Sequence, residues 1–199
     1  ARRWDWQTLQ RECAGNLLNT GPHPVDQAVV LFGDAYPEVF CRMAAYHFDF
    51  GGDADNFCAL TLYGKGRPTI EVQVSSFLAY PQGEQYNIQG TCGGLSGGPA
   101  ELRWKYFDPK SAPKHTLWKP WSFDRQYCSE TLDWQEESWR FAEASSNANG
   151  FVSLSRGVYR NLYGVLRNGA GREITLEQVR RQIFVMEEAH RQNPLPVNE

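Results

Sequence analysis

Asn19, His23 and Asp26 form the densest group of side chains in this sequence that could carry out chemistry. If a helix begins by Asn19, this residue and His23 lie four positions apart and point to the same side, with Asp26 three positions further on. An imidazole that titrates near neutral pH beside a polar partner can act as a general base on a substrate hydroxyl. The same residues also fit a helix start in which Asn19 caps the helix and Asp26 complements its dipole. The spacing alone leaves both interpretations open.

A short helix is expected to carry these side chains, from about Leu18 to Phe32. Pro22 and Pro24 fit only a first helical turn, because the N–H that proline lacks would have no helical partner there. Gly33 follows the last apolar residue and is typical of a helix end. We therefore place the candidate site at the beginning of this helix.

The middle of the chain is predicted to form strands, since its segments are rich in β-branched and aromatic residues and are separated by glycine-containing turns. The expected strands are Glu38–His47, Asn56–Tyr63, Pro68–Leu78, Tyr86–Cys92 and Glu101–Asp108. Apolar and polar residues alternate over Thr69–Ser75, which is typical of a strand with one covered face. Gly93–Gly98 is interpreted as a hairpin turn. The short spacing favours antiparallel pairing, because parallel strands need long crossovers.

The C-terminal part is expected to be helical after a loop-rich stretch at residues 109–150. Leu154, Val158 and Leu162 fall on one helix face, and Thr175 is a suitable N-cap for a last helix. The order of one helix, a run of strands and then helices predicts an α+β fold, with a large, mostly antiparallel sheet and helices packed on one face. We expect residues 1–199 to form a single domain.

Composition argues against several classes of protein. The net charge of -3 gives no electrostatic case for nucleic acid or an anionic membrane as partner. The five cysteines are scattered, which predicts free thiols and neither a disulfide framework nor a metal site. They are Cys13, Cys41, Cys58, Cys92 and Cys128. No apolar run approaches the length of a transmembrane helix, and the first residues lack the apolar stretch of a signal peptide, so we expect a cytoplasmic protein.

Several segments carry a family resemblance. Gly15–Asp26 resembles a helix with the pattern G-G-x-L-x-D-x-G-x-H-x-x-D, and Gln89–Leu95, which follows Pro68–Leu78, resembles a G-T-x-G-G-L sheet hairpin. Flanking segments are similar as well, namely Arg2–Gln7, Tyr159–Tyr163, Arg172–Thr175 and Arg180–Ile183. Together these segments resemble the C-terminal domain of Gfo/Idh/MocA-type NAD(P)-dependent oxidoreductases, in the expected order and over nearly the whole chain.

The resemblance implies a substrate-side domain with a fold like that of the C-terminal domain of glyceraldehyde-3-phosphate dehydrogenase. His23 occupies the position of the family's catalytic histidine, and Asn19 stands where the family usually has an aspartate that works with it. An amide cannot accept a proton at neutral pH, so Asn19 could orient a substrate hydroxyl but could not serve as the base.

Further residues are candidates for substrate binding if the resemblance holds. They are Trp4, Trp6, Asp26, Tyr159 and Arg160. Packing of the aromatic rings at an interface, with a solvated arginine, is an equally good interpretation of most of them. The implied substrate is a sugar, polyol or related hydroxy compound.

The resemblance also implies NAD or NADP as cofactor, bound mainly by an N-terminal Rossmann domain that is missing from this chain. No cofactor-binding residue is expected here, because no G-x-G-x-x-G follows a strand and no E-K-P segment occurs. The chain alone is therefore expected to be inactive, as half of a dehydrogenase. The sheet face without helices should be covered by a second copy, which predicts a homodimer.

A stand-alone carbohydrate-binding or scaffolding module is the alternative function. Aromatic residues make up 14% of the chain and include seven tryptophans, a share that suits a sugar-binding surface. Trp118, Trp121, Trp134 and Trp139 could stack on sugar rings or pack against other aromatic residues. A non-catalytic relative of the family is a third hypothesis, suggested by Asn19.

Overall fold

The computed structural model describes residues 4–46, 51–80, 83–115, 130–141 and 147–197. His47, Cys128, Trp118 and Trp121, to which the predictions above refer, lie outside these ranges, as do Arg2 and Arg3. The chain divides into two compact units, the first formed by Ala1–Pro81 with Tyr163–Glu199 and the second by Gln82–Leu162. Each unit is described by itself.

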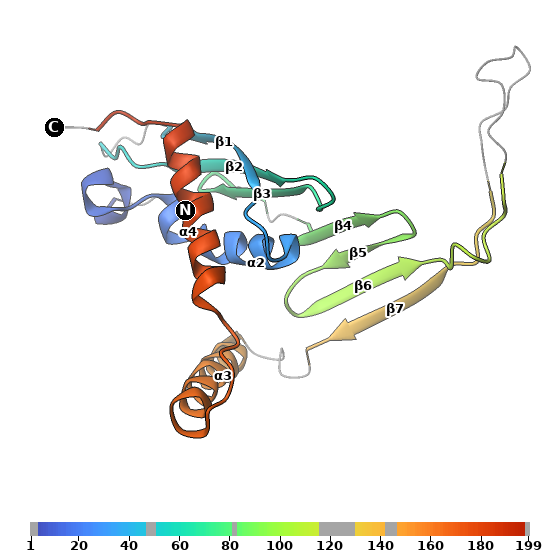
Figure 1. The fold of residues 1–199 in the computed structure, drawn as a ribbon. Coiled ribbons are helices and arrows are strands. Elements are labelled where there is room, and N and C mark those ends of the chain that lie inside the picture. Colours follow the sequence, from blue (N-terminus) through green and yellow to red (C-terminus); the bar gives the residue numbers. More distant parts are fainter. Residues whose placement is uncertain (1–3, 47–50, 81–82, 116–129, 142–146, 198–199) are drawn as a thin grey trace, which may run out of the picture. The chain divides into compact units, whose positions relative to one another are not determined.

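Helices and strands follow one another in the order predicted for an α+β chain (Figure 1). The helical elements are the 3-10 helices η1 (Trp6–Thr8) and η2 (Gln10–Glu12), and the α-helices α1 (Asn16–Asn19), α2 (Pro22–Phe32), α3 (Asn147–Asn168) and α4 (Leu176–Gln192). The strands are β1 (Glu38–Ala44), β2 (Phe57–Tyr63), β3 (Ile70–Ser75), β4 (Tyr86–Gly90), β5 (Gly93–Gly97), β6 (Glu101–Tyr106) and β7 (Gln135–Arg140). The predicted α+β class with antiparallel strand pairing is confirmed, and the strands of the described residues fall into a three-stranded and a four-stranded sheet.

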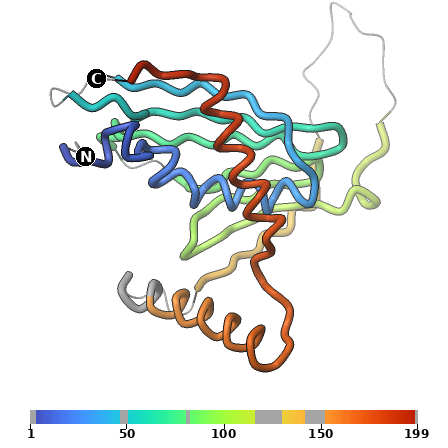
Figure 2. Tube along the Cα trace, turned by 60° about the vertical axis from the view of Figure 1, so that its left-hand side comes forward, coloured from blue at the N-terminus to red at the C-terminus, as the bar shows by residue number. Residues whose placement is uncertain are grey.

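The first unit is built on the three-stranded sheet, in the order β1-β2-β3. Both strand pairs are antiparallel, with Cys41 opposite Leu60 and Leu60 opposite Val72. Because side chains alternate along a strand, these three residues share one face, and they are buried there. Helices α2 and α4 cross this face (Figure 2) and bury Val29 and Val185 against it. The predicted layer of helices on one sheet face is therefore present in this unit.

The end of α4 also closes the free edge of this sheet, where β1 has no strand neighbour. Gln192 accepts a hydrogen bond from Cys41 N at 2.9 Å and donates one to Val39 O at 2.7 Å. Asn193 accepts from Met43 N at 3.0 Å and donates to Cys41 O at 3.0 Å. Side chains thus satisfy backbone groups that an edge strand would otherwise offer to another chain.

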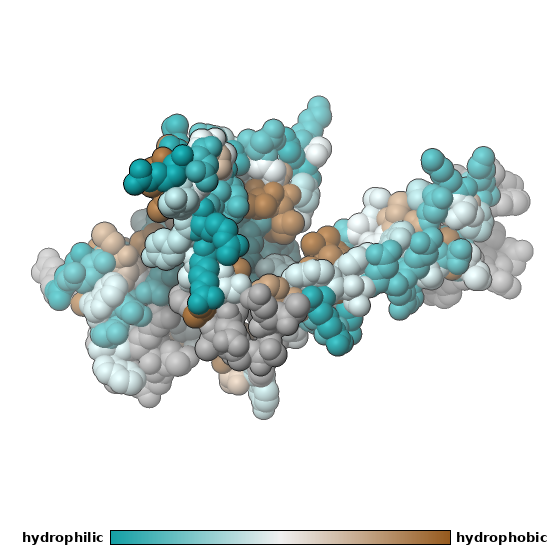
Figure 3. All heavy atoms as spheres, turned by 90° about the horizontal axis from the view of Figure 1, so that it is seen from below, coloured by the Kyte–Doolittle hydropathy of each residue, from teal (hydrophilic) through white to brown (hydrophobic). Residues whose placement is uncertain are grey.

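Helix α4 begins where the sequence predicted, because Thr175 Oγ1 accepts a hydrogen bond from Gln178 N at 3.1 Å. Its buried residues are Val185 and Ala189, which pack on the core described above. Helix α3 confirms the predicted helix around Leu154–Leu166. No helix among the described residues is both long and apolar enough to cross a membrane. On the face drawn in Figure 3, hydrophobic residues form small groups among hydrophilic ones.

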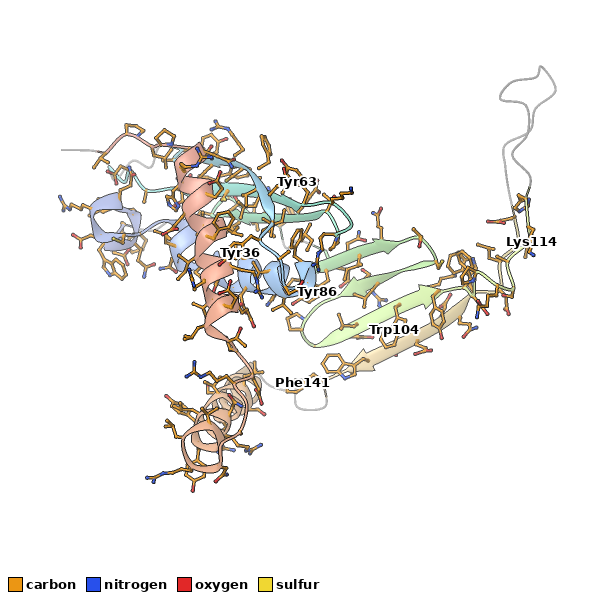
Figure 4. The ribbon with its side chains drawn as sticks, viewed as in Figure 1. Tyr36, Tyr63, Tyr86, Trp104, Lys114 and Phe141 are labelled. Carbon is orange, nitrogen blue, oxygen red and sulfur yellow. The ribbon has the colours of Figure 1, made fainter. Side chains whose placement is uncertain are left out.

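The four-stranded sheet of the second unit has two chemically different faces. Its order is β4-β5-β6-β7, and all neighbours are antiparallel. One face, which we call the aromatic face, carries Tyr86, Ile88, Leu95, Leu102, Trp104, Tyr106 and Trp139. The opposite face, which we call the polar face, carries Asn87, Gln89, Ser96, Arg103, Lys105, Glu136 and Ser138. Tyr86 and Trp104 are labelled in Figure 4.

Two elements of this sheet differ from the prediction. Gly93–Gly97 is strand β5 rather than a turn, and the hairpin turn lies at Thr91 and Cys92, between the paired residues Gly90 and Gly93. A Cβ on Gly93 would lie 2.8 Å from Tyr106 Cα, so glycine is needed where β6 approaches closely. Strand β7 falls in the stretch that was expected to be loop-rich. Its charged residues give it no strand-like apolar alternation to detect.

Candidate functional site

The helix predicted from Leu18 to Phe32 is in fact two helices, and the candidate residues lie on either side of the break. Asn19 is the last residue of α1, and His23 is the second residue of α2. The break follows from Pro22 and Pro24, which have no N–H to continue the helical hydrogen bonds. Instead, Gly21 N donates to Asn16 O at 2.8 Å and His23 N to Thr20 O at 3.3 Å.

Gly21 allows the two helices to meet at close range. A Cβ at this position would lie 2.8 Å from Leu17 Cα and even closer to Leu17 O. Thr20 and Gly21 nevertheless keep right-handed helical dihedral angles. Asn19 and His23 therefore remain about one helical turn apart, and both side chains are exposed.

Helix α4 fixes the beginning of α2. Gln182 Nε2 donates to Pro22 O at 2.6 Å, and Gln178 Nε2 donates to Asp26 Oδ1 at 2.9 Å. Each bond joins residues that are far apart in the sequence, so α4 holds the turn that carries His23 in place. Asp26, which was predicted to bind substrate, has one carboxylate oxygen engaged in this way.

A buried carboxylate fixes the beginning of α1. Asp55 Oδ2 accepts a hydrogen bond from Leu17 N at 2.9 Å, and Asp55 O accepts one from Asn16 N at 2.8 Å. Asp55 is 4% exposed, and this burial raises the pKa of its carboxyl, while the nearby His190 and the hydrogen bond from Leu17 N oppose the shift. A side chain at Gly15 would collide with Asp55 Oδ1, so the carboxylate lies tightly beneath the helix start.

Asn16 extends this polar network to the sheet. Its Nδ2 donates to Asn56 O at 3.0 Å and to Ser76 Oγ at 2.9 Å. Asn56 in turn donates to Tyr46 O at 2.6 Å and accepts from Tyr46 N at 2.9 Å. The segment bearing Asn19 and His23 is thus tied to both ends of the loop between β1 and β2.

The predicted site residues are divided between the two units. Trp4 and Trp6 lie at the start of the first unit and are 75% and 55% exposed. Tyr159 and Arg160 lie on α3 in the second unit and are also exposed. Within the first unit, the structure places Asn19, His23 and Asp26 on one short stretch of chain.

The residues that position this stretch were not identified from the sequence. They are Asn16, Asp55, Asn56, Ser76, Gln178 and Gln182. Their partners lie up to 160 positions away, so spacing along the chain carries no signal for them. Buried Asp and Asn directly before a strand are an unusual combination, which could have drawn attention to Asp55 and Asn56.

The described residues provide neither a phosphate-binding turn nor a metal site. The glycine-rich segment forms strand β5 and leads into β6, whereas a dinucleotide-binding turn leads from a strand into a helix. No group of three or more histidine, cysteine or acidic side chains is arranged to hold a metal within the described part of the chain.

An antiparallel sheet with helices packed on one face defines the first unit as an α+β fold. Residues 1–96 match the family described as the GFO/IDH/MocA C-terminal domain. This match over residues 1–96 confirms the resemblance that the sequence patterns predicted. No curated protein matches the chain.

Solved structures of low sequence identity share the fold. An NAD-binding protein from Listeria innocua is 17% identical, with a TM-score of 0.61 over 98% of this chain and 54% of that one. An oxidoreductase from Bacillus cereus is 15% identical, with a TM-score of 0.61 over 93% and 52%. An oxidoreductase from Agrobacterium radiobacter in complex with NAD+, L-tartaric acid and magnesium is 12% identical, with a TM-score of 0.59 over 91% and 48%. The chain thus spans about half the length of the structures that it matches.

Proposed function

We propose that residues 1–199 act as one functional domain, the substrate-binding and dimerisation part of an NAD(P)-dependent oxidoreductase. The observation that carries the proposal is the anchored, exposed Asn19–His23 segment within the residues that match the GFO/IDH/MocA C-terminal domain. The substrate class is a sugar, polyol or related hydroxy compound. The structure from Agrobacterium radiobacter with NAD+ and L-tartaric acid, a compound with two hydroxyl groups, gives this class its support.

His23 is the residue that exchanges a proton with the substrate hydroxyl in this proposal. Its exposed imidazole stands at the start of α2, where α4 holds the backbone through Pro22. Asn19 orients the hydroxyl, since an amide oxygen accepts and an amide nitrogen donates hydrogen bonds without taking up the proton. Asp26 contributes through its second carboxylate oxygen, and Trp4, Trp6, Tyr159 and Arg160 are proposed to line the substrate pocket of the complete enzyme.

NAD or NADP supplies hydride transfer when it is bound, and we propose that it is held mainly by a part of the enzyme beyond these 199 residues. In consequence this chain alone is expected to be inactive, and the complete enzyme to work in the cytoplasm.

Calorimetric titration of NAD(H) and NADP(H) into this chain and into the full-length enzyme tests whether the cofactor is held mainly outside residues 1–199. We expect binding by the full-length enzyme only. Tight binding by this chain alone would contradict the proposal, because it would require a nucleotide site within residues 1–199.

Substitution of His23 tests the proposed chemistry in the full-length enzyme. His23→Ala should lower kcat by about 10²–10⁴-fold on a polyol panel, which is the usual contribution of a general acid or base. His115→Ala is the matched control, because His115 is also exposed and pairs with Glu130 at 2.8 Å in the other unit. Equal activity of the His23 variant and the control would refute the role of His23.

A further inference from the structure

A hollow of the second unit lies on the polar face of the four-stranded sheet. It is an open groove of about 790 Å³, within the size range of ligand sites in proteins. Its lining includes Asn87, Gln89, Ser96, Ser138 and Trp134. Neither Asn19 nor His23 belongs to its lining.

The groove presents hydrogen-bonding groups that the described part of the chain leaves unused. The side chains of Asn87 and Gln89 project from β4, and those of Ser96 and Ser138 from β5 and β7. No side-chain hydrogen bond joins any of these four groups to another described residue. These neutral donors and acceptors come from three strands, and Arg103 of β6 lies between Ser96 and Ser138 in the register. Such groups suit a ligand with many hydroxyl groups.

The two cations of the groove are each paired with a carboxylate, and Glu137, which also lines it, accepts a hydrogen bond from Tyr106 at 2.8 Å. Lys105 Nζ lies 2.8 Å from Glu136 Oε1, and this ammonium group lowers the pKa of the Glu136 carboxyl. Arg103 pairs with Glu84 at 2.6 Å. Because each cation has its own carboxylate, the groove carries no excess positive charge to attract a phosphate, a nucleic acid or an acidic peptide.

An aromatic ring completes the groove at one end. Trp134 packs edge-on against Phe107, with ring centroids 5.3 Å apart, and Lys105 Nζ lies 5.2 Å from the Trp134 ring. These contacts fix the ring while leaving Trp134 42% exposed. A fixed, exposed indole offers an apolar surface on which the C–H face of a sugar ring can stack.

We propose that this groove binds a neutral oligosaccharide. The sugar stacks on Trp134 and forms hydrogen bonds with the amide and hydroxyl side chains described above. The neutral amide and hydroxyl groups, the paired cations and the fixed ring together favour this ligand over charged ones. The proposal goes beyond the function proposed above, because it adds a second binding site in a unit that does not contain His23.

Titration calorimetry with maltohexaose, cellohexaose and mannohexaose into residues 1–199 tests the proposal. At least one of them should bind, and Trp134→Ala should weaken that binding about tenfold or more. Trp139→Ala is the matched control, because Trp139 is 45% exposed on the aromatic face of the same sheet. This control and His23→Ala should leave binding unchanged, which separates the groove from the catalytic segment.

A second variant tests the groove independently, in case Trp134→Ala does not fold. Asn87→Ala combined with Gln89→Ala removes two exposed side chains without described partners, and it should weaken binding to a similar degree. The proposal fails if no oligosaccharide binds at millimolar concentration, or if Trp139→Ala weakens binding as much as Trp134→Ala. It also fails if Trp134→Ala changes only the sedimentation coefficient, since the groove would then be a contact between copies.

Discussion

At the scale of single residues, Asp55 is the clearest case of a side chain whose ionised form destabilises the folded chain. Its carboxylate is buried beneath α1, where burial raises its pKa above the usual value of an aspartate, and its hydrogen bond to Leu17 N only partly opposes this. A raised pKa means that the folded chain binds the proton more tightly than the unfolded chain does. The stabilising contribution is therefore complete below the unfolded pKa and is lost as pH rises through the folded pKa.

We predict that Asp55→Asn removes this pH dependence, because asparagine keeps an oxygen for Leu17 N and cannot ionise. The free energy of unfolding of the natural chain relative to this variant should fall as pH rises from below the usual pKa of an aspartate to above the raised pKa of Asp55. Urea unfolding at several pH values measures it. Asp34→Asn is the control, because Arg67 lowers the pKa of Asp34 through a hydrogen bond of 2.7 Å. The free energy of unfolding of the natural chain relative to this variant should therefore rise with pH. If the difference in free energy of unfolding between the natural chain and Asp55→Asn does not change with pH, the pKa of Asp55 is not raised in the folded chain.

Residue chemistry was predictable from the sequence only where the partners are close along the chain. Asn19 and His23 are neighbours through helical spacing, and Thr175 caps the helix that follows it directly. Asp55 meets Leu17 across 38 positions, and only the folded chain brings them together. The positioning of the candidate site depends on such long-range bonds, which spacing alone does not reveal.

At the scale of elements, the break between α1 and α2 decides where Asn19 and His23 stand. Gly21 is required by the close approach of Leu17, and not by an unusual dihedral angle. We predict that Gly21→Ala destabilises the chain by about 1–3 kcal/mol, the usual range for overpacking. Denaturant unfolding checks this.

Gly157→Ala on α3 is the matched helix control, since no atom outside its own helix lies within 4 Å of an added Cβ. It should be neutral or stabilising by up to about 1 kcal/mol, because alanine favours helices. Equal effects of the two substitutions would show that Gly21 is not under steric constraint.

Strand prediction succeeded where apolar and polar residues alternate and failed where glycine or charge hides the pattern. β3 alternates and was found, with Val72 and Val74 buried. β5 consists mainly of glycine, which turns also favour, and only the close approach of β6 distinguishes the two. β7 has no buried residue, so no hydrophobic period marks it.

At the scale of the whole molecule, the first unit has one sheet face that its own helices do not cover. We call it the open face, and it carries the side chains of Phe40, Phe57, Thr61 and Tyr63. Phe40 is 63% exposed, and Tyr63 is labelled in Figure 4. Exposed aromatic residues on a sheet face mark an association surface, which is the physical basis for the proposed homodimer.

Because a twofold dimer presents the same surface twice, one substitution on the open face introduces two charges into the interface. We predict that the natural chain sediments as a dimer and that Phe40→Asp weakens association about 100-fold or more, through burial of unpaired carboxylates. Leu31→Asp is the matched control, because Leu31 is 52% exposed on α2, on the helix side of the same sheet, and it should leave the dimer intact. Sedimentation velocity measures both. A natural chain that remains monomeric at about 100 µM would exclude the open face as a dimer interface, since stable homodimer interfaces of ordinary size dissociate well below that concentration.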